Sequence, residues 1–184
     1  MRILFVCSGN ICRSPLGEQL LRAELGAVDS VTVESAGTIA QDGAAMDGFA
    51  ASQSVRLGGD PGPHASRYLT ESIAASADLV LTAERSHRAD VVRLSPRASK
   101  RAFTIKQFAR VLDGLEPDDL ADVTSPEQLV ERVARLRGTV APPADPADDD
   151  VDDPYRRSES THERVATEIH RAVATIADAL RAIA

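Results

Sequence analysis

The stretch RILFVCSGNICRSP at residues 2–15 decides the fold. Its apolar first part, residues 2–6, is rich in β-formers and does not alternate, which predicts a parallel strand covered on both faces. A polar loop follows, and Ser14-Pro15 then offers an N-cap with proline at the first helical position. Spaced leucines continue the pattern, so we predict a helix that ends near Gly26. The chain opens as strand, loop and helix.

Strand and helix signals alternate through the rest of the chain. Further strands are predicted at residues 31–33, 77–82 and 101–104, and helices at 41–55, 84–94, 105–112, 126–137 and from about 160 onward. The Pro- and Asp-rich stretch at 139–153 is predicted to be a solvated loop. Alternating strands and helices imply right-handed crossovers and a parallel sheet, so the predicted fold class is α/β.

Composition limits the class of protein. A chain of 184 residues is within the usual range of one domain, so we expect a single domain over 1–184. The net charge of -7 disfavours nucleic acid or an acidic membrane as a partner, because either would need a clustered basic face. The apolar run Ile3–Val6 is too short for a signal peptide or a membrane span.

The cysteine and histidine content argues against metal binding. Two cysteines make no disulfide framework and are too few for a four-ligand zinc site. His87, His162 and His170 are predicted to be surface residues rather than metal ligands. We therefore expect a soluble protein of the reducing cytoplasm that uses no metal ion or other cofactor.

The loop at residues 7–14 has the features of an anion site. Gly9 permits a tight turn, and the loop leads into a helix N-terminus whose N–H groups and dipole favour a phosphate dianion. The same groups favour the thiolate of Cys7, which is the nucleophilic form. The planar guanidinium of Arg13 can bind two phosphoryl oxygens at once. We predict that Cys7 attacks phosphorus and that Arg13 stabilises the charge on the transferred group.

A cysteine followed by an arginine at this spacing is a weak signal by itself. The alternative is that Cys7 is a buried residue at a strand end and Arg13 a surface charge. That alternative leaves the glycine, Asn10 and Ser14-Pro15 between strand and helix unexplained. Their joint presence favours the catalytic interpretation.

The segment Val6–Pro15 resembles the signature of the low-molecular-weight protein tyrosine phosphatases. Three further segments, Ser35-Ala36-Gly37-Thr38, His64-Ala65-Ser66-Arg67 and Asp153-Pro154-Tyr155, resemble motifs of the same family. The resemblance covers most of residues 1–95 and 150–184. It implies the family fold, which is a four-stranded parallel twisted sheet flanked by helices in one domain. The segment at about 113–143 is longer than is usual in the family, and we expect it to be an insertion.

The resemblance also assigns roles around the loop. It implies that Asn10 shapes the loop by bonding to Ser14, Ser35 and His64, and that Ser14 donates a hydrogen bond to the departing sulfur of Cys7. The phosphate or another oxyanion is expected to bind to the loop itself, at Ser8, Gly9, Asn10, Ile11, Cys12 and Arg13. The alternative for His64 is a polar turn residue.

The second cysteine has two interpretations. Cys12 occupies the position of a second thiol in the family, which implies a reversible disulfide with Cys7 under oxidation. The alternative is that Cys12 only packs in the core.

Breaking a phosphate ester requires an acid opposite the nucleophile, and the loop before the last helix holds many carboxylates. We choose Asp153, because Tyr155 follows it as in the family and offers an aromatic wall for a phenyl ring. Asp145, which also precedes proline, is the alternative.

The predicted function is hydrolysis of phosphotyrosine in proteins, or of small aryl phosphates, through a phosphocysteine intermediate. Arsenate reductases of the same fold that use an internal thiol relay need a further cysteine, and none follows Cys12, so only a form resolved by an external thiol stays open. Protein-arginine phosphatases tend to have Thr at the position of Ile11. A binding module without turnover is disfavoured because the nucleophile and the acid are both present. Arg156 and Arg157 replace the family's second aromatic and predict a preference for acidic surroundings of the phosphate.

Overall fold

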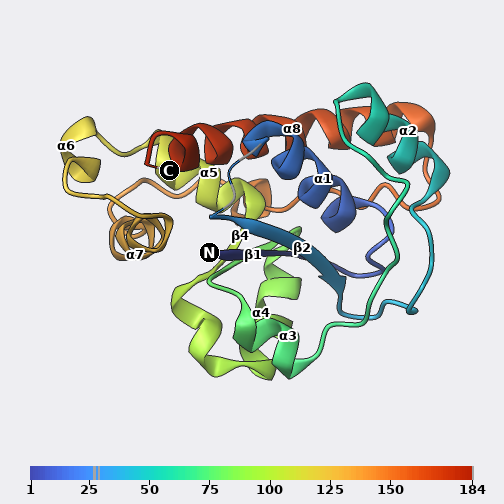
Figure 1. Ribbon diagram of the computed structural model, residues 1–184, viewed down its shortest axis with the longest axis horizontal. Coiled ribbons are helices and arrows are strands. Elements are labelled where there is room, and N and C mark those ends of the chain that lie inside the picture. The colour runs from blue at the N-terminus through green and yellow to red at the C-terminus, as the bar shows by residue number, and fades with distance from the viewer. Residues whose placement is uncertain (27, 29, 184) are drawn as a thin grey trace.

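Four parallel strands form one sheet in the order β2-β1-β3-β4 (Figure 1). The computed structural model describes residues 1–26, 28 and 30–183. The strands are β1 (Arg2–Cys7), β2 (Thr32–Gly37), β3 (Leu79–Thr82) and β4 (Ala102–Thr104). β1 pairs with both β2 and β3, so its carboxyl end lies in the middle of the sheet edge. The predicted α/β class with a four-stranded parallel sheet is confirmed.

Helices cover both faces of the sheet (Figure 1). One face carries α1 (Arg13–Leu25), α2 (Gly48–Arg56), α5 (Ile105–Asp113) and the long α8 (Glu159–Arg181). The other face carries α3 (Glu71–Ser76) and α4 (Arg85–Leu94). Two short helices, α6 (Pro117–Leu120) and α7 (Pro126–Leu136), lie beyond the sheet, and 3-10 turns span Pro96–Lys100 and Pro146–Asp149.

The two faces of β1 belong to two separate parts of the core. Ile3 and Phe5 belong to the larger part, which also contains apolar side chains of α1, α5 and α8. Leu4 and Val6 belong to the smaller part beneath α3 and α4. All four side chains are almost completely buried, which explains why the strand is a continuous apolar run.

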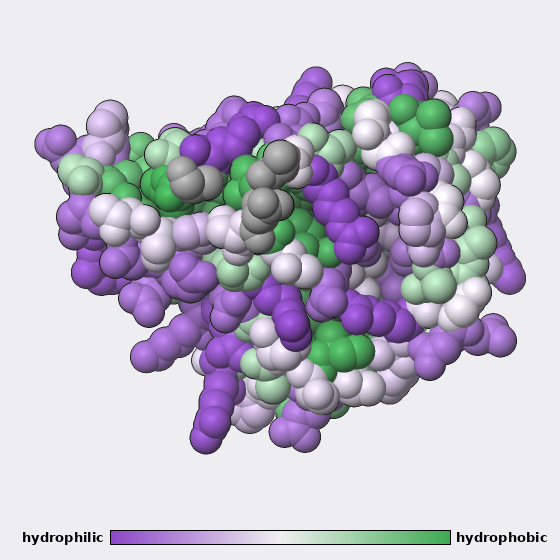
Figure 2. Space-filling model, viewed as in Figure 1, coloured by the Kyte–Doolittle hydropathy of each residue, from purple (hydrophilic) through white to green (hydrophobic). Residues whose placement is uncertain are grey.

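The exterior is mostly hydrophilic on the face drawn in Figure 2, with apolar side chains in small groups, one of them over α2. α2 carries two exposed apolar side chains, Phe49 and Val55. Within the described part of the chain, no helix is long and apolar enough to cross a membrane.

Two predicted helices begin at other residues in the structure. The helix expected at 41–55 begins only at Gly48, because the Asp47 carboxylate accepts hydrogen bonds from the N–H groups of Phe49 and Ala50 and so caps it there. Helix α1 begins at Arg13, two residues before the predicted first helical position at Pro15, because the hydroxyl of Ser14 bonds inside the loop instead of capping the helix. Helices α3 and α6 have no counterpart among the predicted elements.

The predicted surface positions of two histidines are wrong. His87 is 4% exposed and bonds to Ser8, and His162 is 2% exposed and packs against Phe49 of α2. His170 is partly exposed and lies 3.1 Å from a carboxylate oxygen of Glu24. The predicted solvated loop at 139–153 is also wrong at its end, because Val151 and Asp149 are buried.

The segment at 113–143 contains α6, α7 and their connections. That this segment is an insertion relative to the family stays a prediction. The single domain over 1–184 also stays a prediction, and Ala184 lies outside the described residues.

Leu20→Ala tests the packing of α1 on the sheet. Leu20 is completely buried, so the variant should lose about 2–5 kcal/mol of unfolding free energy through lost burial and a cavity. The matched control is Leu94→Ala at the end of α4, where the side chain is 40% exposed and the loss should be clearly smaller. Urea denaturation measures both. Equal losses would contradict the central place of α1 in the core.

Candidate active site

The loop between β1 and α1 stands at the carboxyl end of the central strand. Cys7 is the last residue of β1, and Arg13 is the first residue of α1. The residue with a left-handed backbone is Asn10, with φ of 54°, and not Gly9. Asparagine tolerates this conformation better than most residues because its short polar side chain can bond locally. The loop therefore depends on Asn10 for its shape as well as for its contacts.

The side-chain amide of Asn10 connects the loop to its surroundings. Its Nδ2 donates to the hydroxyl of Ser14 at 2.9 Å and to that of Ser35 at 2.8 Å. The Ser14 hydroxyl also lies 3.0 Å from the Cys7 sulfur. All four side chains are buried. A chain of hydrogen bonds thus runs from the end of β2 to the candidate nucleophile.

The segment around residues 64–67 holds the other side of Asn10. His64 donates from Nε2 to the Asn10 carbonyl at 2.8 Å, and the backbone N–H of Arg67 donates to Asn10 Oδ1 at 2.9 Å. The structure therefore brings together Asn10, Ser14, Ser35 and His64, as the resemblance implies. These contacts hold the loop from both sides of Asn10.

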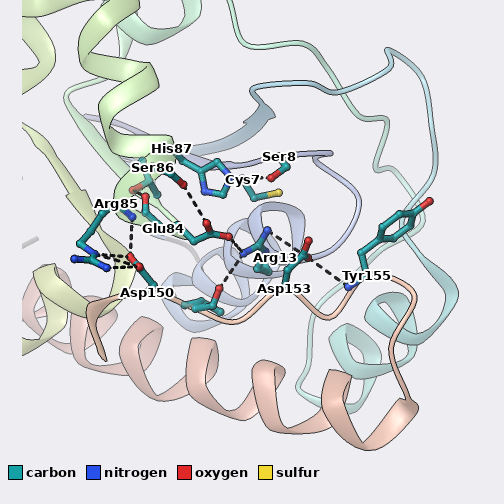
Figure 3. A network of polar contacts seen from close by, with 12 residues as sticks. Cys7, Ser8, Arg13, Glu84, Arg85, Ser86, His87, Asp150, Asp153 and Tyr155 are labelled. Atoms are coloured by element: carbon teal, nitrogen blue, oxygen red, sulfur yellow. Dashed lines mark hydrogen bonds and ion pairs between the residues drawn. The ribbon is translucent and has the colours of Figure 1, made fainter. Parts of the chain in front are cut away.

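Arg13 is 2% exposed, although it carries a full positive charge. It forms an ion pair with Glu84, donates from Nη1 to the carbonyl of Val151 at 2.9 Å, and lies 3.3 Å from Oδ1 of Asp153 through Nη2 (Figure 3). Burial alone would raise the pKa of the Glu84 carboxyl, but the hydrogen bond and charge of Arg13 outweigh it, so this pKa lies below its usual value. Glu84 is therefore an ionised partner of Arg13 at neutral pH.

A cavity of about 370 Å³ opens above the loop. Its lining includes the sulfur-bearing Cys7 and the candidate acid, and the full set is Cys7, Ser8, Gly9, Ile11, Cys12, Arg13, Ile39, Gln41, Ala44, Asp153 and Tyr155. Ile39 and Tyr155 are exposed at the rim, 75% and 45% respectively. The candidate nucleophile, cation, acid and aromatic wall therefore share one cavity of the size that a small ligand occupies.

The acidic loop before α8 is held by ion pairs near its end, while most of its residues are exposed. Asp149 pairs with Arg110 at 2.8 Å, and Asp150 pairs with Arg85 at 3.0 Å. Asp153 lies in the cavity lining and is 52% exposed. The remaining partners are Arg164 for Asp152 and the backbone N–H of Ala147 for Asp145. The structure thus places Asp153 at the site and Asp145 in a turn of its own.

Cys12 lies at the start of α1 and is buried, as is Cys7. Burial, together with the negative charges of Asp47, Cys7 and Asp153, raises the pKa of the Cys12 thiol well above its ordinary value. Cys12 is therefore a protonated thiol at neutral pH. Both cysteines are unpaired.

Two polar residues of the site were missed in the sequence analysis. Glu84 follows β3 directly and binds Arg13, and His87 lies one turn further and bonds to Ser8 at 2.8 Å. Their position after β3 was the available signal. The carboxyl ends of neighbouring parallel strands meet at the same edge of a sheet, so residues that follow β3 are expected near the loop that follows β1.

Comparison with known proteins identifies the family. Residues 2–135 match the model of the low molecular weight phosphotyrosine protein phosphatases. A tyrosine phosphatase named Etp from Escherichia coli K12 is 39% identical over 106 residues, which are 58% of this chain and 70% of that protein. A protein-arginine-phosphatase from Geobacillus stearothermophilus is 36% identical over 134 residues, 73% of this chain and 86% of that protein.

Solved structures extend the likeness beyond residue 135. The low molecular weight protein tyrosine phosphatase from T. tengcongensis superposes with a TM-score of 0.71 at 28% identity and covers 98% of this chain and 99% of that chain. Vibrio vulnificus Wzb in complex with benzylphosphonate superposes with a TM-score of 0.70 at 26% identity, over 97% of this chain and 98% of that one. The fold and the loop define a cysteine-dependent phosphatase. The chain belongs to the low molecular weight protein tyrosine phosphatase family.

Asn10→Ala tests whether Asn10 organises the loop. The variant removes a buried hub and puts a residue without a local side-chain bond into a left-handed position, so we expect a loss of about 2–4 kcal/mol of unfolding free energy. In Asp60→Ala, an exposed bond to the N–H of Gly62 is lost, and the change should stay within about 0.5–1 kcal/mol. Chemical denaturation compares them. Similar losses in both variants would show that the loop does not depend on Asn10.

Proposed function

We propose that this protein hydrolyses phosphate monoesters of tyrosine, in phosphoproteins or as small aryl phosphates, through a phosphocysteine intermediate. The observation that carries the proposal is the single cavity in which the Cys7 sulfur, the Arg13 guanidinium and the Asp153 carboxyl meet. Membership of the phosphatase family supports the same reaction.

In the first step, the thiolate of Cys7 attacks phosphorus, and the bond from phosphorus to the phenolic oxygen breaks. The loop N–H groups and Arg13 bind the equatorial oxygens, whose negative charge increases in the transition state. Arg13 is already oriented by Glu84 and by the Val151 carbonyl, so little reorganisation is needed when the phosphate enters. Asp153, protonated in this step, gives its proton to the leaving oxygen.

In the second step, water attacks the phosphocysteine. Asp153, now ionised, takes a proton from that water, and the bond between phosphorus and the Cys7 sulfur breaks. The Ser14 hydroxyl, 3.0 Å from that sulfur, is placed to donate a hydrogen bond to it as it regains negative charge. Inorganic phosphate leaves and the enzyme returns to its starting form.

Substitutions of the nucleophile and the acid test this mechanism with phosphotyrosine as substrate, in the presence of EDTA. Cys7→Ser should abolish turnover, and Asp153→Asn should lower kcat by about 10²–10⁴, the contribution of a general acid. Asp153→Asn should lose less with p-nitrophenyl phosphate, whose more acidic leaving group needs less protonation.

The matched control for the acid is Asp145→Asn in the same loop. Its carboxylate caps the turn at Ala147, so turnover should remain near wild type. A large loss in this variant together with a small loss in Asp153→Asn would reassign the acid. Wild-type protein without turnover under reducing conditions would refute the proposed function.

Phosphoarginine is the second candidate substrate, because a relative that is 36% identical is named a protein-arginine-phosphatase. Ile11 lines the cavity, and its larger side chain favours the tyrosine-directed form of the family. Asp153 would protonate the leaving guanidine nitrogen in the same geometry.

Ile11→Thr separates the two substrates. The smaller polar side chain should raise the ratio of kcat/KM for phosphoarginine over phosphotyrosine by about tenfold, the scale expected for a change of this size in a pocket. Ile39→Thr makes the same change at the exposed rim and should leave the ratio near that of the wild type. Steady-state assays on both substrates measure it. A wild type that prefers phosphoarginine would reverse the assignment.

Three further parts of the proposal concern the compartment, the oxidation of Cys7 and the surroundings of the phosphate in the substrate. Two free cysteines fit a reducing cytoplasm. Oxidation of Cys7 by a peroxide to a sulfenic acid, followed by condensation with the Cys12 thiol and loss of water, would give a reversible disulfide.

Arg156 and Arg157, which follow Tyr155 at the cavity, favour substrates with acidic residues beside the phosphotyrosine.

A further inference from the structure

His87 is a buried histidine in direct contact with the phosphate loop. It lies in the first turn of α4, is 4% exposed, and has its Nε2 2.8 Å from the Ser8 hydroxyl oxygen (Figure 3). Its other ring nitrogen, Nδ1, is buried and has no hydrogen-bond partner among the described residues. Ser8 lines the cavity, whereas His87 stands behind it. The ring can therefore act on a ligand only through the serine.

The lack of a hydrogen-bond partner for Nδ1 indicates which nitrogen of the His87 ring carries the proton. With the proton on Nδ1, a buried N–H would have no acceptor, which is rare and costly in folded proteins. With the proton on Nε2, the ring donates to the Ser8 oxygen and leaves only a lone pair at Nδ1. The neutral ring with its proton on Nε2 is the form that fits the site.

The surroundings of His87 both lower and raise the pKa of its ring. Burial lowers the pKa of the ring, and the positive charge of Arg13 lowers it further, while Glu84, Asp90 and Asp153 oppose this. The net shift is downward. The ring is thus neutral at neutral pH, which agrees with the tautomer that the contacts require.

This bond determines what the Ser8 hydroxyl can do. Because its oxygen accepts the proton of Nε2, its own hydrogen must point away from the ring. We propose that His87 is a positioning residue that makes Ser8 a hydrogen-bond donor to the phosphoryl group in the cavity. This inference rests on the proposed function, since it assigns Ser8 an additional contact to the phosphate that Cys7 attacks.

Phosphate binding tests this role separately from turnover. Inorganic phosphate is titrated into proteins that carry Cys7→Ser, by calorimetry, so that catalysis plays no part. Adding Ser8→Ala or His87→Phe should each weaken binding by about tenfold, the value of one hydrogen bond to a charged group. Adding both should weaken it no more than Ser8→Ala alone, because His87 acts through Ser8.

Two further variants separate positioning from packing. His87→Gln retains an N–H donor and should recover part of the lost affinity, whereas His170→Phe on α8, far from the loop, should leave phosphate binding unchanged. If His87→Phe does not fold, His87→Ala takes its place, alone and combined with Ser8→Ala. Unchanged binding in Ser8→Ala, or additive losses in the double variant, would overturn the role of His87. A wild type that binds phosphate as expected but does not hydrolyse phosphotyrosine would refute the proposed function. It would not contradict the role of His87 in phosphate binding by Ser8.

Stability against pH checks the neutral ring. Because the folded pKa of His87 is lower than the unfolded value of about 6.5, the unfolded state binds the extra proton first as the pH falls. The contribution of the neutral ring is therefore complete above about pH 6.5 and is lost on acidification. As the pH falls below about 6.5, the free energy of unfolding should decrease less steeply in the His87→Gln variant than in the wild type. An identical slope would contradict the neutral form.

Discussion

The buried positive charge of Arg13 is the constraint on which the site depends. A guanidinium that is 2% exposed needs negative charge close by, because an unpaired buried charge costs about 3–5 kcal/mol. Its partners come from distant parts of the chain: Glu84 follows β3, and Val151 and Asp153 precede α8. One cation thus binds two distant segments at the carboxyl edge of the sheet. The same pairing places the candidate acid over the candidate nucleophile before any substrate arrives.

Asn10 provides the complementary constraint on the loop itself. Its left-handed backbone turns the chain, and its side chain binds two buried hydroxyls and a backbone N–H of the 64–67 segment. These partners hold the loop in its shape from several sides. The binding energy of phosphate can then stabilise the transition state rather than order the loop.

The sequence predicted the fold class and most of the loop, because both are local. The apolar run of β1, the Gly-containing loop and the proline at the start of α1 lie within a few residues of one another. The start of helix α2 was predicted seven residues too early, because the carboxylate of Asp47 caps the helix at Gly48. Val151 in the acidic loop was also a signal, as a single apolar residue among aspartates that proves to be buried.

The burial of His87 and the use of Ser14 could not be predicted in the same way. Ser14 reads as a helix cap, and only the approach of the Cys7 sulfur at 3.0 Å shows why its hydroxyl is needed elsewhere. His87 lies four residues before the buried Val91, a helical spacing that places both side chains on one face of α4, but histidine is intermediate between buried and exposed residue types. Their roles come from contacts between distant segments.

The attachment of the acidic loop explains how the site tolerates a long segment at 113–143. That segment leaves from the end of α5 and returns to the acidic loop, and α5 itself holds the loop. Arg110 pairs with Asp149 at 2.8 Å, and Lys106 donates to the carbonyl of Asp150 at 3.1 Å. The position of Asp153 is therefore determined by α5 and Arg13, whatever the length of chain between them. Since lengthening a loop adds little to the cost of closing it, α6 and α7 can lie beyond the sheet without displacing the acid.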